Sequence, residues 1–312
     1  MNSRVAFITG ASRGIGKVCA VDLAKAGFDV AVTARTVNPN EGREHSSTIR
    51  ESDTSPLPGS LSEVAALIRD AGQEALVVPA DLLDPVSLGA AAATVLERWG
   101  RVDLVVHNGR YIGPGHMDRF LDTPIDLIEK QIQANVVAPL ILDRLFLPTM
   151  IERGGGTIVN ITSGSAYGTP TKPAGEGGWG MGYGMSKAAF HRVAGFLAVE
   201  LGEVGIHCFN VQPGLIATER IAQDMAKFGI ENTGEPPEVV AAVVTWLVTS
   251  PDAVALNGEN IEAPYFCHEH GLLPGWPGPA YRDNPIKYDK SGAVLEELEL
   301  RLAESLAAQP RA

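Results

Sequence analysis

The chain contains 312 residues, 45% of them hydrophobic and 20% charged, which is enough for one large domain with a buried core and excludes a chain that is disordered throughout. Its net charge of −12, from 25 Lys and Arg against 37 Asp and Glu, argues against a surface that binds nucleic-acid phosphates or an anionic membrane. The three cysteines form no C-x-x-C pair, no apolar run reaches the ~18 residues of a membrane span, and no secretory leader is visible, so we expect a soluble, cytoplasmic protein without a metal site.

The order of apolar segments predicts an alternation of strands and helices. An apolar run at residues 5–8, a glycine-containing turn, a helical pattern through Ala26 and a second apolar run at 29–32 form a β-α-β unit. Further strands are expected at residues 75–79, 103–106, 157–161, 206–212 and 260–262, and a long helical stretch at 124–153. Strands that are apolar on both faces and alternate with helices are typical of a doubly wound α/β protein, here with a parallel sheet of about seven strands and helices on both faces.

The turn between the first strand and the first helix is rich in glycine, because residues 9–16 read Thr-Gly-Ala-Ser-Arg-Gly-Ile-Gly. Glycines at this place allow a tight turn, a close approach of backbone N–H groups to a pyrophosphate and close packing of helix on strand. The amino terminus of the following helix also favours an anion. We therefore interpret the segment as a dinucleotide-binding turn rather than a plain βα turn.

The second strand ends in Thr33-Ala34-Arg35. It lacks the acidic residue that usually accepts hydrogen bonds from an unphosphorylated adenosine ribose. Arg35 and Arg13 could make charge-assisted contacts with a 2′-phosphate, and the alternative is that both are solvated surface arginines. Their joint placement favours NADP over NAD.

Three segments interrupt the alternation. Residues 38–60 are polar and precede a capping box at 60–63, which predicts an inserted surface loop. Residues 164–182 hold seven glycines, two prolines and Trp179, a composition typical of a flexible loop that contacts a ligand. After residue 263 the alternation stops, and a helical stripe of apolar residues follows at 294–306. We therefore expect one domain over residues 1–263 and a carboxyl-terminal extension over 264–312.

Several residues that can perform acid–base chemistry are predicted near one edge of the sheet. Tyr183 and Lys187 are four residues apart, on one face of a helix. Ser163 follows the predicted strand at 157–161, at the carboxyl edge where open α/β sheets bind ligands. Asn135 lies inside a helical run, where Asn is a poor helix former, and it could hold a water against a freed carbonyl group.

These features together resemble the short-chain dehydrogenase/reductase family, in its compact single-domain branch with a Rossmann-type fold. The resemblance extends from about Val5 to Glu262. The glycine turn is similar to the family's T-G-x-x-x-G-x-G, Tyr183 and Lys187 to its Y-x-x-x-K, and residues 107–110, His-Asn-Gly-Arg, to its N-N-A-G. The matching motifs occur in the family's order, which makes coincidence untenable as an explanation.

The resemblance implies a cofactor site and a catalytic group. The residues implied to bind the dinucleotide are Gly10, Ser12, Arg13, Gly14, Ile15, Gly16, Arg35, Asp81, Leu82, Asn108, Gly109, Tyr183, Lys187, Pro213, Gly214, Ile216 and Thr218. The implied catalytic residues are Asn135, Ser163, Tyr183 and Lys187. The family is also usually dimeric or tetrameric, which implies a homodimer or homotetramer here.

The implied roles agree with the chemistry of the side chains. A carbonyl group that accepts hydride needs a hydrogen-bond donor and a proton. Tyr183 would supply the proton, Lys187 would lower the pKa of the phenol and bind the nicotinamide ribose, and Ser163 would orient the substrate oxygen. Asn135 would hold a water that connects Lys187 to solvent.

The chain departs from the family pattern at several positions. Arg110 replaces the last glycine of N-N-A-G, where it either faces solvent or recognises an anionic group of the substrate. The segment between Ser163 and Tyr183 is longer than usual, and we expect Tyr167, Trp179 and Met181 to line a large, mostly apolar pocket, although Trp179 could instead pin the loop to the surface. Residues 267–270, Cys-His-Glu-His, lack a partner cluster, which favours a surface turn over a metal site.

Three functional hypotheses remain at this stage. The first is an NADP(H)-dependent oxidoreductase that interconverts a carbonyl compound and a secondary alcohol. The second is an NAD-dependent alcohol dehydrogenase on the same scaffold, with Arg35 incidental. The third is a nicotinamide-binding sensor or assembly protein without useful turnover, and the presence of Ser163 and Asn135, which a pure binder does not need, argues against it. The expected partner of the enzyme is a small-molecule carbonyl or alcohol substrate.

Overall fold

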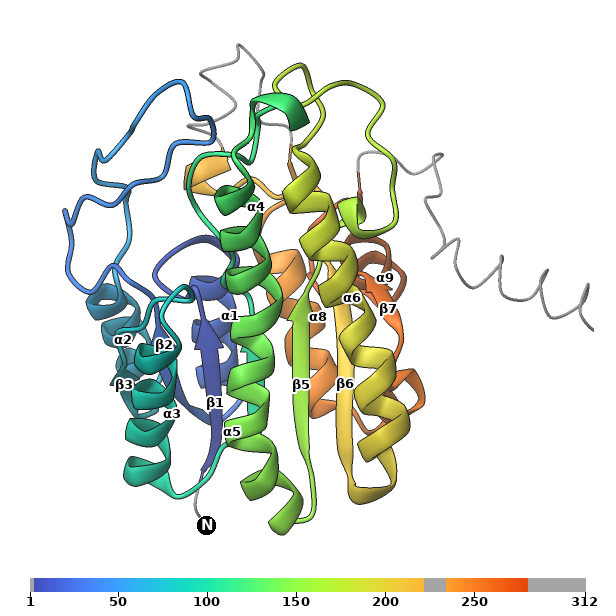
Figure 1. The fold of residues 1–312 in the computed structure, drawn as a ribbon. Coiled ribbons are helices and arrows are strands. Elements are labelled where there is room, and N and C mark those ends of the chain that lie inside the picture. Colours follow the sequence, from blue (N-terminus) through green and yellow to red (C-terminus); the bar gives the residue numbers. More distant parts are fainter. Residues whose placement is uncertain (1–2, 222–233, 280–312) are drawn as a thin grey trace, which may run out of the picture.

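The fold is built around one parallel sheet of seven strands. The computed structural model describes residues 3–221 and 234–279. The strands lie in the order β3-β2-β1-β4-β5-β6-β7 (Figure 1), and every neighbouring pair is parallel. Their bounds are β1 Arg4–Thr9, β2 Phe28–Thr33, β3 Ala75–Val77, β4 Leu104–His107, β5 Gly156–Ile161, β6 Ile206–Gln212 and β7 Asn260–Glu262. The predicted doubly wound, Rossmann-type sheet is confirmed.

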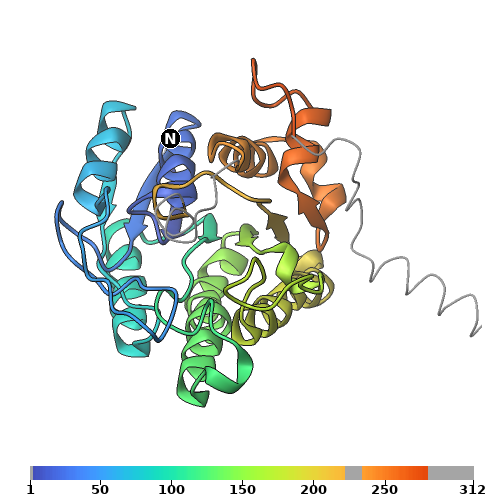
Figure 2. The same ribbon diagram turned by 90° about the horizontal axis from the view of Figure 1, so that it is seen from above.

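Helices cover both faces of the sheet, as Figure 2 shows from above. Buried side chains of α1, α2 and α8 form the core on one face, together with α9, and those of α3, α5 and α6 form the core on the other. The α-helices are α1 Gly14–Lys25, α2 Leu61–Asp70, α3 Pro85–Trp99, α4 Ile125–Ile132, α5 Ala138–Glu152, α6 Met181–Leu201, α8 Glu238–Thr249 and α9 Ala263–Glu269. Because both faces are covered, most strand residues are buried, which explains the continuous apolar runs of the strands.

Local sequence signals explain where several helices begin and end. The Ser60 hydroxyl accepts a hydrogen bond from the backbone N–H of Glu63 at 3.3 Å and starts α2. Asp84 caps α3 through the backbone N–H of Val86 at 2.9 Å, and Pro85 occupies the first helical position. Gly100 ends α3 in the left-handed conformation with φ 65°, which a glycine adopts without steric cost.

The longest continuous helical stretch is apolar. Residues Ile125–Glu152 contain an 18-residue window of mean hydropathy 1.4, and half of this window is buried. Leu142, Phe146 and Met150 belong to the core under the sheet, where the Phe146 ring lies 5.0 Å from the Phe7 ring of β1. Length and composition alone would permit a membrane span, and packing on the sheet accounts for the same apolar residues.

The order of the strands determines where on the sheet a ligand can bind. The chain builds outward from β1 to β3 and then returns, so that β4 pairs with β1 on its other side. At such a switch point the loops after the two central strands diverge and leave a crevice at their carboxyl ends. The glycine turn follows β1 and residues 108–110 follow β4, so both predicted motifs meet at this crevice.

The described part of the carboxyl-terminal extension packs on the rest of the fold. Helix α9 lies against α8, and Ala263 and Cys267 are buried in the core. The Phe266 ring lies 5.0 Å from the Trp246 ring of α8, and Trp276 donates a hydrogen bond from Nε1 to Glu235 at 3.1 Å. The predicted helical stripe at 294–306 lies outside the described residues.

Candidate active site

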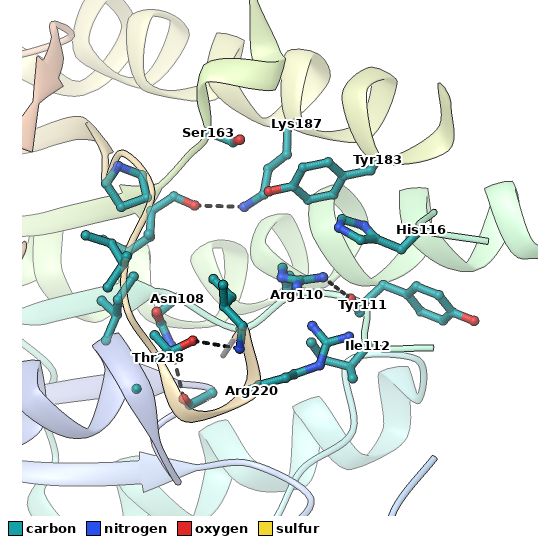
Figure 3. Close-up of a pocket in the computed structure, with 18 of the residues that line it drawn as sticks. Asn108, Arg110, Tyr111, Ile112, His116, Ser163, Tyr183, Lys187, Thr218 and Arg220 are labelled. Atoms are coloured by element: carbon teal, nitrogen blue, oxygen red, sulfur yellow. Dashed lines mark hydrogen bonds between the residues drawn. The ribbon is translucent and has the colours of Figure 1, made fainter. Parts of the chain in front are cut away.

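A cavity of about 1040 Å³ opens at the carboxyl edge of the sheet. Its wall combines the glycine turn after β1, the segments that follow β2, β4, β5 and β6, the inserted loop and the start of α6. Figure 3 shows that Ser163, Tyr183 and Lys187 face this space from one side and Thr218 and Arg220 from another. The predicted cofactor and catalytic motifs therefore converge on one cavity.

The glycine turn is shaped by close approaches of backbone to backbone. Gly10 has φ 65°, and a Cβ on this residue would stand 2.8 Å from the Cα of Gly109. A Cβ on Gly16 would stand 2.4 Å from the carbonyl oxygen of Gly10. Neither position tolerates a side chain without a shift of the backbone, which explains why glycine is needed there.

The loop after β4 is joined to this turn by hydrogen bonds. Asn108 donates from Nδ2 to the carbonyl oxygens of Thr9 and Gly10, both at 3.0 Å, and the backbone N–H of Gly109 donates to Thr9 Oγ1 at 2.8 Å. Helix α1 begins at Gly14 without a side-chain cap. Its first turn is therefore open to an external anion, and the cradle fits the pyrophosphate of a dinucleotide.

The other residues expected to bind the cofactor are distributed around the same cavity. The residues that line it are Gly10, Ser12, Arg13, Gly14, Ile15, Arg35, Asp81, Leu82, Asn108, Gly109, Tyr183, Lys187, Pro213, Gly214, Ile216 and Thr218. Gly16 differs from them, because it lies behind the lining at the contact between α1 and the glycine turn. Its role is close packing of helix on strand.

The two arginines expected at the adenosine end have different surroundings. The Arg13 guanidinium donates to the carbonyl oxygens of Pro58 and Gly59, both at 2.9 Å, so its hydrogen-bonding capacity is used largely by the inserted loop. Arg35 lines the cavity, and its side chain makes no hydrogen bond or ion pair within residues 3–221 and 234–279. Arg35 is therefore the arginine whose guanidinium is available to a phosphate.

The residues expected to be catalytic lie where β5 and α6 meet the cavity. Tyr183 and Lys187 share one face of α6, and Ser163 follows β5. Lys187 is 4% exposed and donates from Nζ to the carbonyl oxygen of Ile161 at 2.8 Å. Burial, and secondarily the positive charge of Arg110, lowers the pKa of Lys187 to about 7. The Ser163 hydroxyl accepts hydrogen bonds from the N–H and hydroxyl of Ser165 at 3.2 and 3.0 Å.

Asn135 supports the catalytic group from the layer behind the cavity. It lies in a π-helical segment, Gln133–Val137, between α4 and α5. Its Oδ1 accepts a hydrogen bond from the backbone N–H of Tyr111 at 2.6 Å, and its Nδ2 donates to Ser186 Oγ at 2.8 Å. The side chain therefore joins the loop after β4 to α6, and the wide helical turn is the irregularity that a buried Asn in this run indicates.

The residues expected around the substrate fall into two groups. Tyr167, Trp179 and Arg110 line the cavity, and the Tyr167 hydroxyl donates a hydrogen bond to Glu262. The expectation for Met181 is wrong, because Met181 is 48% exposed and absent from the cavity wall. Helix α6 begins at this residue, and the first turn directs its side chain away from the cavity.

His107, at the first position of the segment similar to N-N-A-G, contributes to the core. It is 1% exposed, and its Nε2 lies 2.7 Å from Asp143 Oδ1 of α5. This contact joins the end of β4 to the helix that covers it. The substitution is therefore structural, whereas Arg110 is exposed to the cavity.

Sequence reasoning missed two cavity residues near the catalytic group. The His116 ring packs edge-on against the Tyr183 ring, with 4.4 Å between centroids. Burial and the charges of Arg110, Arg220 and Lys187 lower the pKa of His116 well below its usual range. No local signal marks His116, whereas Arg220 follows closely after Thr218 in the segment expected to hold the nicotinamide.

The inserted loop, residues 38–60, is attached to three separate parts of the cavity rim. Besides its contacts with Arg13, the loop contacts Arg220, whose Nη2 donates a hydrogen bond to the carbonyl oxygen of His45 at 3.2 Å. On the opposite side, Asp118 accepts from the backbone N–H of Ile49 at 2.9 Å and from the Thr48 hydroxyl at 2.5 Å. The loop therefore spans the cavity mouth, and is more than a surface insertion.

Comparison with known proteins identifies related sequences. A family model for short chain dehydrogenase matches residues 4–54 and 54–227. An L-rhamnose 1-dehydrogenase (NAD(P)(+)) from Sphingomonas sp. is 32% identical over 72% of this chain and 78% of its own length. A cyclohexanol dehydrogenase from Rhodococcus sp. is 30% identical over 73% of this chain and 80% of its own.

A solved structure shows the same architecture. The 7α-hydroxysteroid dehydrogenase complexed with NADH and 7-oxo glycochenodeoxycholic acid is 26% identical. It aligns with a TM-score of 0.65 over 83% of this chain and 92% of the other. The similarity of fold therefore extends over most of the chain.

Proposed function

The chain belongs to the short-chain dehydrogenase/reductase family, and from this premise we propose that it interconverts a carbonyl compound and a secondary alcohol by hydride transfer with NADP(H). The observation that carries the proposal is the placement of Tyr183 and Lys187 on one face of α6, beside Ser163, in the cavity that the glycine turn enters. The named relatives with known activities oxidise alcohols, including a sugar and cyclohexanol. A bound nicotinamide would supply or accept the hydride.

The residues of this chain would perform the proton chemistry. Tyr183 donates a proton to the substrate oxygen during reduction and accepts it during oxidation, and Ser163 donates a hydrogen bond that orients the same oxygen. Lys187, in its protonated form, stabilises negative charge on the Tyr183 oxygen. Asn135 joins α6 to the loop after β4 through Ser186 and Tyr111, and its proposed further role is to hold a water that connects Lys187 to solvent.

The substitution Tyr183→Phe tests the catalytic assignment. We expect turnover to fall by at least about 10²-fold, because a positioned acid–base group contributes roughly that factor. Binding of the dinucleotide, measured by calorimetry, should stay within a few-fold of the wild type and serves as the control for folding. A variant that keeps most of its activity contradicts the assignment, and cofactor binding by a wild type that turns over no carbonyl compound favours the sensor hypothesis instead.

The preference for NADP(H) rests on Arg35. The end of β2 carries no carboxylate that would accept hydrogen bonds from a free ribose, and the Arg35 side chain has no hydrogen bond or ion pair in the described ranges. The competing proposal, an NAD-dependent enzyme, is favoured by the use of Arg13 for the inserted loop and by the NADH in the related steroid dehydrogenase structure.

Parallel titrations with NADPH and NADH distinguish the two cofactors. We expect tighter binding of NADPH, and we expect Arg35→Asp to reverse the preference, because it replaces a phosphate-binding charge with a ribose acceptor. Arg13→Met is the matched comparison, because loss of a contact with the inserted loop should weaken the binding of NADPH and NADH by the same factor. Equal or tighter NADH binding by the wild type would assign the enzyme to the NAD-dependent class.

We further propose that the chain acts in the cytoplasm as a homodimer or homotetramer assembled through α5 and α6. Apolar side chains on these helices are exposed, among them Leu145, Phe196 and Val199, the last to 86%. Exposed apolar side chains of this density are typical of an interface. Light scattering of the purified protein measures the assembly directly, and a monomer at micromolar concentration would contradict this proposal.

A further inference from the structure

Arg110 brings a positive charge to the catalytic end of the cavity. It follows Gly109 at the carboxyl end of β4, and its guanidinium carbon lies 5.6 Å from the centroid of the Tyr183 ring. Its hydrogen bond is donated from Nη1 to the carbonyl oxygen of Tyr111 at 3.0 Å. Figure 3 shows the guanidinium between Tyr183 and Arg220, on the cavity side of the loop.

This guanidinium has no carboxylate partner in the part of the chain that the structure describes. Six carboxylates of the described residues lie on the cavity wall, and none of them pairs with Arg110. Five accept hydrogen bonds elsewhere: Glu41 from the backbone N–H groups of residues 37 and 38, Glu44 from those of Ser46 and Asp53, Asp81 from that of Leu83, Glu235 from Trp276, and Glu262 from Tyr167 and Gln212. The sixth, Glu219, acts on Arg13. A guanidinium has five N–H donors, and one carbonyl oxygen uses few of them. Capacity for an external anion therefore remains.

The surrounding charges are also positive. The charged groups that act on His116 are Arg110, Arg220 and Lys187, and the one that acts on Lys187 is Arg110. A cavity in which cations crowd together, in a protein of net charge −12, is stabilised when an anion enters. Charge of one sign lining a cleft also raises the local concentration of ligands of the opposite sign.

Two kinds of anion could bind to the Arg110 guanidinium: a phosphate of the dinucleotide or an anionic group of the substrate. The expected phosphate positions are the glycine turn before α1 and, at the adenosine end, Arg35. Arg110 instead extends toward Tyr183 and His116, the groups that surround the reacting carbonyl. The position therefore favours the substrate over the cofactor.

We propose that Arg110 binds a carboxylate of the substrate and makes the enzyme specific for oxo and hydroxy carboxylic acids, with the carboxylate a few bonds from the reacting carbon. This inference rests on the proposed oxidoreductase function. In the reduction, the carbonyl carbon receives the hydride from the reduced dinucleotide and the oxygen receives the proton of Tyr183, while the carboxylate remains unchanged on Arg110. A bidentate pair between guanidinium and carboxylate would fix which face of the carbonyl meets the hydride.

The test compares acids with their uncharged esters. The substrates are α-, β- and γ-oxo carboxylic acids and the methyl ester of each, and the variants are Arg110→Met, which keeps an apolar stem without the charge, and Arg110→Lys, which keeps the charge. Arg153→Met is the matched control, because Arg153 is exposed at the end of α5 and its side chain makes no hydrogen bond or ion pair within residues 3–221 and 234–279. Calorimetric titration with NADPH and NADH accompanies each variant.

For at least one acid, we expect the wild type to have a kcat/KM about 10- to 100-fold above that of its ester, the range of a charge-assisted hydrogen bond. Arg110→Met should remove this difference by lowering kcat/KM for the acid alone, Arg110→Lys should restore part of it, and Arg153→Met should change neither value. Cofactor affinity should stay within a few-fold throughout.

Several outcomes would overturn the inference. If Arg110→Met weakens dinucleotide binding, or lowers acid and ester turnover by the same factor, the charge serves the cofactor or the fold. If the wild type reduces uncharged ketones and esters at least as well as the acids, the substrate class is wrong while the proposed function stands. A wild type that reduces no carbonyl compound at all removes the proposed function, and this inference with it.

Discussion

Lys187 is a buried cation that faces another cation, and this arrangement connects catalysis to stability. Burial removes water from its ammonium group, which donates a hydrogen bond to the carbonyl oxygen of Ile161 instead. The positive charge of Arg110 also repels the ammonium group. Both effects favour the neutral amine in the cofactor-free protein. A reaction that needs the ammonium form therefore needs an anion, from cofactor or substrate, to keep Lys187 charged near neutral pH.

This arrangement predicts a pH dependence of stability. The pKa of Lys187 is about 7 in the folded protein and about 10.4 in the unfolded chain. Between these two pH values, Lys187 is protonated in the unfolded chain and neutral in the folded protein. The free energy of unfolding should therefore rise with pH across this window, by at most about 5 kcal/mol, since one pKa unit corresponds to about 1.4 kcal/mol. Below about pH 7 both states are protonated, and this contribution no longer changes.

Urea unfolding of the cofactor-free protein at several pH values measures the effect. Lys187→Met removes the titrating group, so the stability difference between variant and wild type should shift in favour of the wild type as pH rises from 7 to 10. Arg110→Met should narrow the pH range over which stability changes, because loss of the neighbouring charge raises the pKa of Lys187. A stability difference that is constant with pH would show that Lys187 titrates normally.

The residue scale also shows which sites a sequence can predict. Ser163, Tyr183 and Lys187 follow from their places at a strand end and on a helix face, which local patterns determine. The partners of Arg13 and the ring of His116 depend on the paths of loops, which bring together residues far apart in the chain. The prediction for Met181 was wrong for a similar reason, because the exact start of α6 determines which way that side chain points.

At the scale of elements, the inserted loop is the feature that changes how the cavity opens. The polar composition of residues 38–60 indicated a surface loop, and the capping box at Ser60 correctly marked the start of α2. Composition could not indicate that the loop reaches across to Asp118, because that contact is formed between segments about seventy residues apart. We infer from its contacts that the loop covers a route by which a ligand enters or leaves the cavity.

We predict that this attachment slows the exchange of the dinucleotide. Asp118 is 4% exposed and accepts hydrogen bonds from Thr48 and Ile49; each such bond to a charged group contributes about 1.5–3 kcal/mol. Asp118→Ala should therefore raise the dissociation rate of the bound dinucleotide about tenfold or more, measured by stopped-flow displacement. It should also make the loop more sensitive to limited proteolysis.

Asp122→Ala provides the control for this prediction. Asp122 pairs with Arg50 of the same loop at 4.0 Å, and both side chains are exposed, so the pair should contribute little. We expect its dissociation rate to match that of the wild type. Identical rates for the Asp118 and Asp122 variants would show that the loop does not govern exchange.

At the scale of the whole molecule, the alternation of strands and helices together with the right-handed crossovers of parallel sheets predicts a parallel sheet whose strands all end at one edge. These rules place the glycine turn and the loop after β4 at one edge, and the sequence therefore predicts the location of the cavity. They say nothing of how the chain continues after the last strand. We propose that the domain proper ends near residue 263 and that the extension, 264–312, begins as a structural cover for α8.

The described part of this extension should be required for full stability. Phe266 contacts the rings of Trp246 and His270, with centroids 5.0 and 4.1 Å apart, and Cys267 is 1% exposed. Because Phe266 is partly buried, Phe266→Ala should lower the free energy of unfolding by about 2 kcal/mol, which is less than for a fully buried aromatic side chain. Phe120→Ala, at a position 50% exposed, should change it by less than about 0.5 kcal/mol.

Two truncations extend the test to the segment itself. A chain that ends after residue 279 keeps α9 and the hydrogen bond from Trp276 to Glu235, whereas a chain that ends after residue 262 loses both and exposes the apolar side of α8. The shorter chain should therefore unfold at a lower temperature, and should bind the dinucleotide more weakly because Pro264 and Tyr265 line the cavity. Equal melting temperatures for the two truncated chains would mean that the sheet and its two helical layers are stable without this cover.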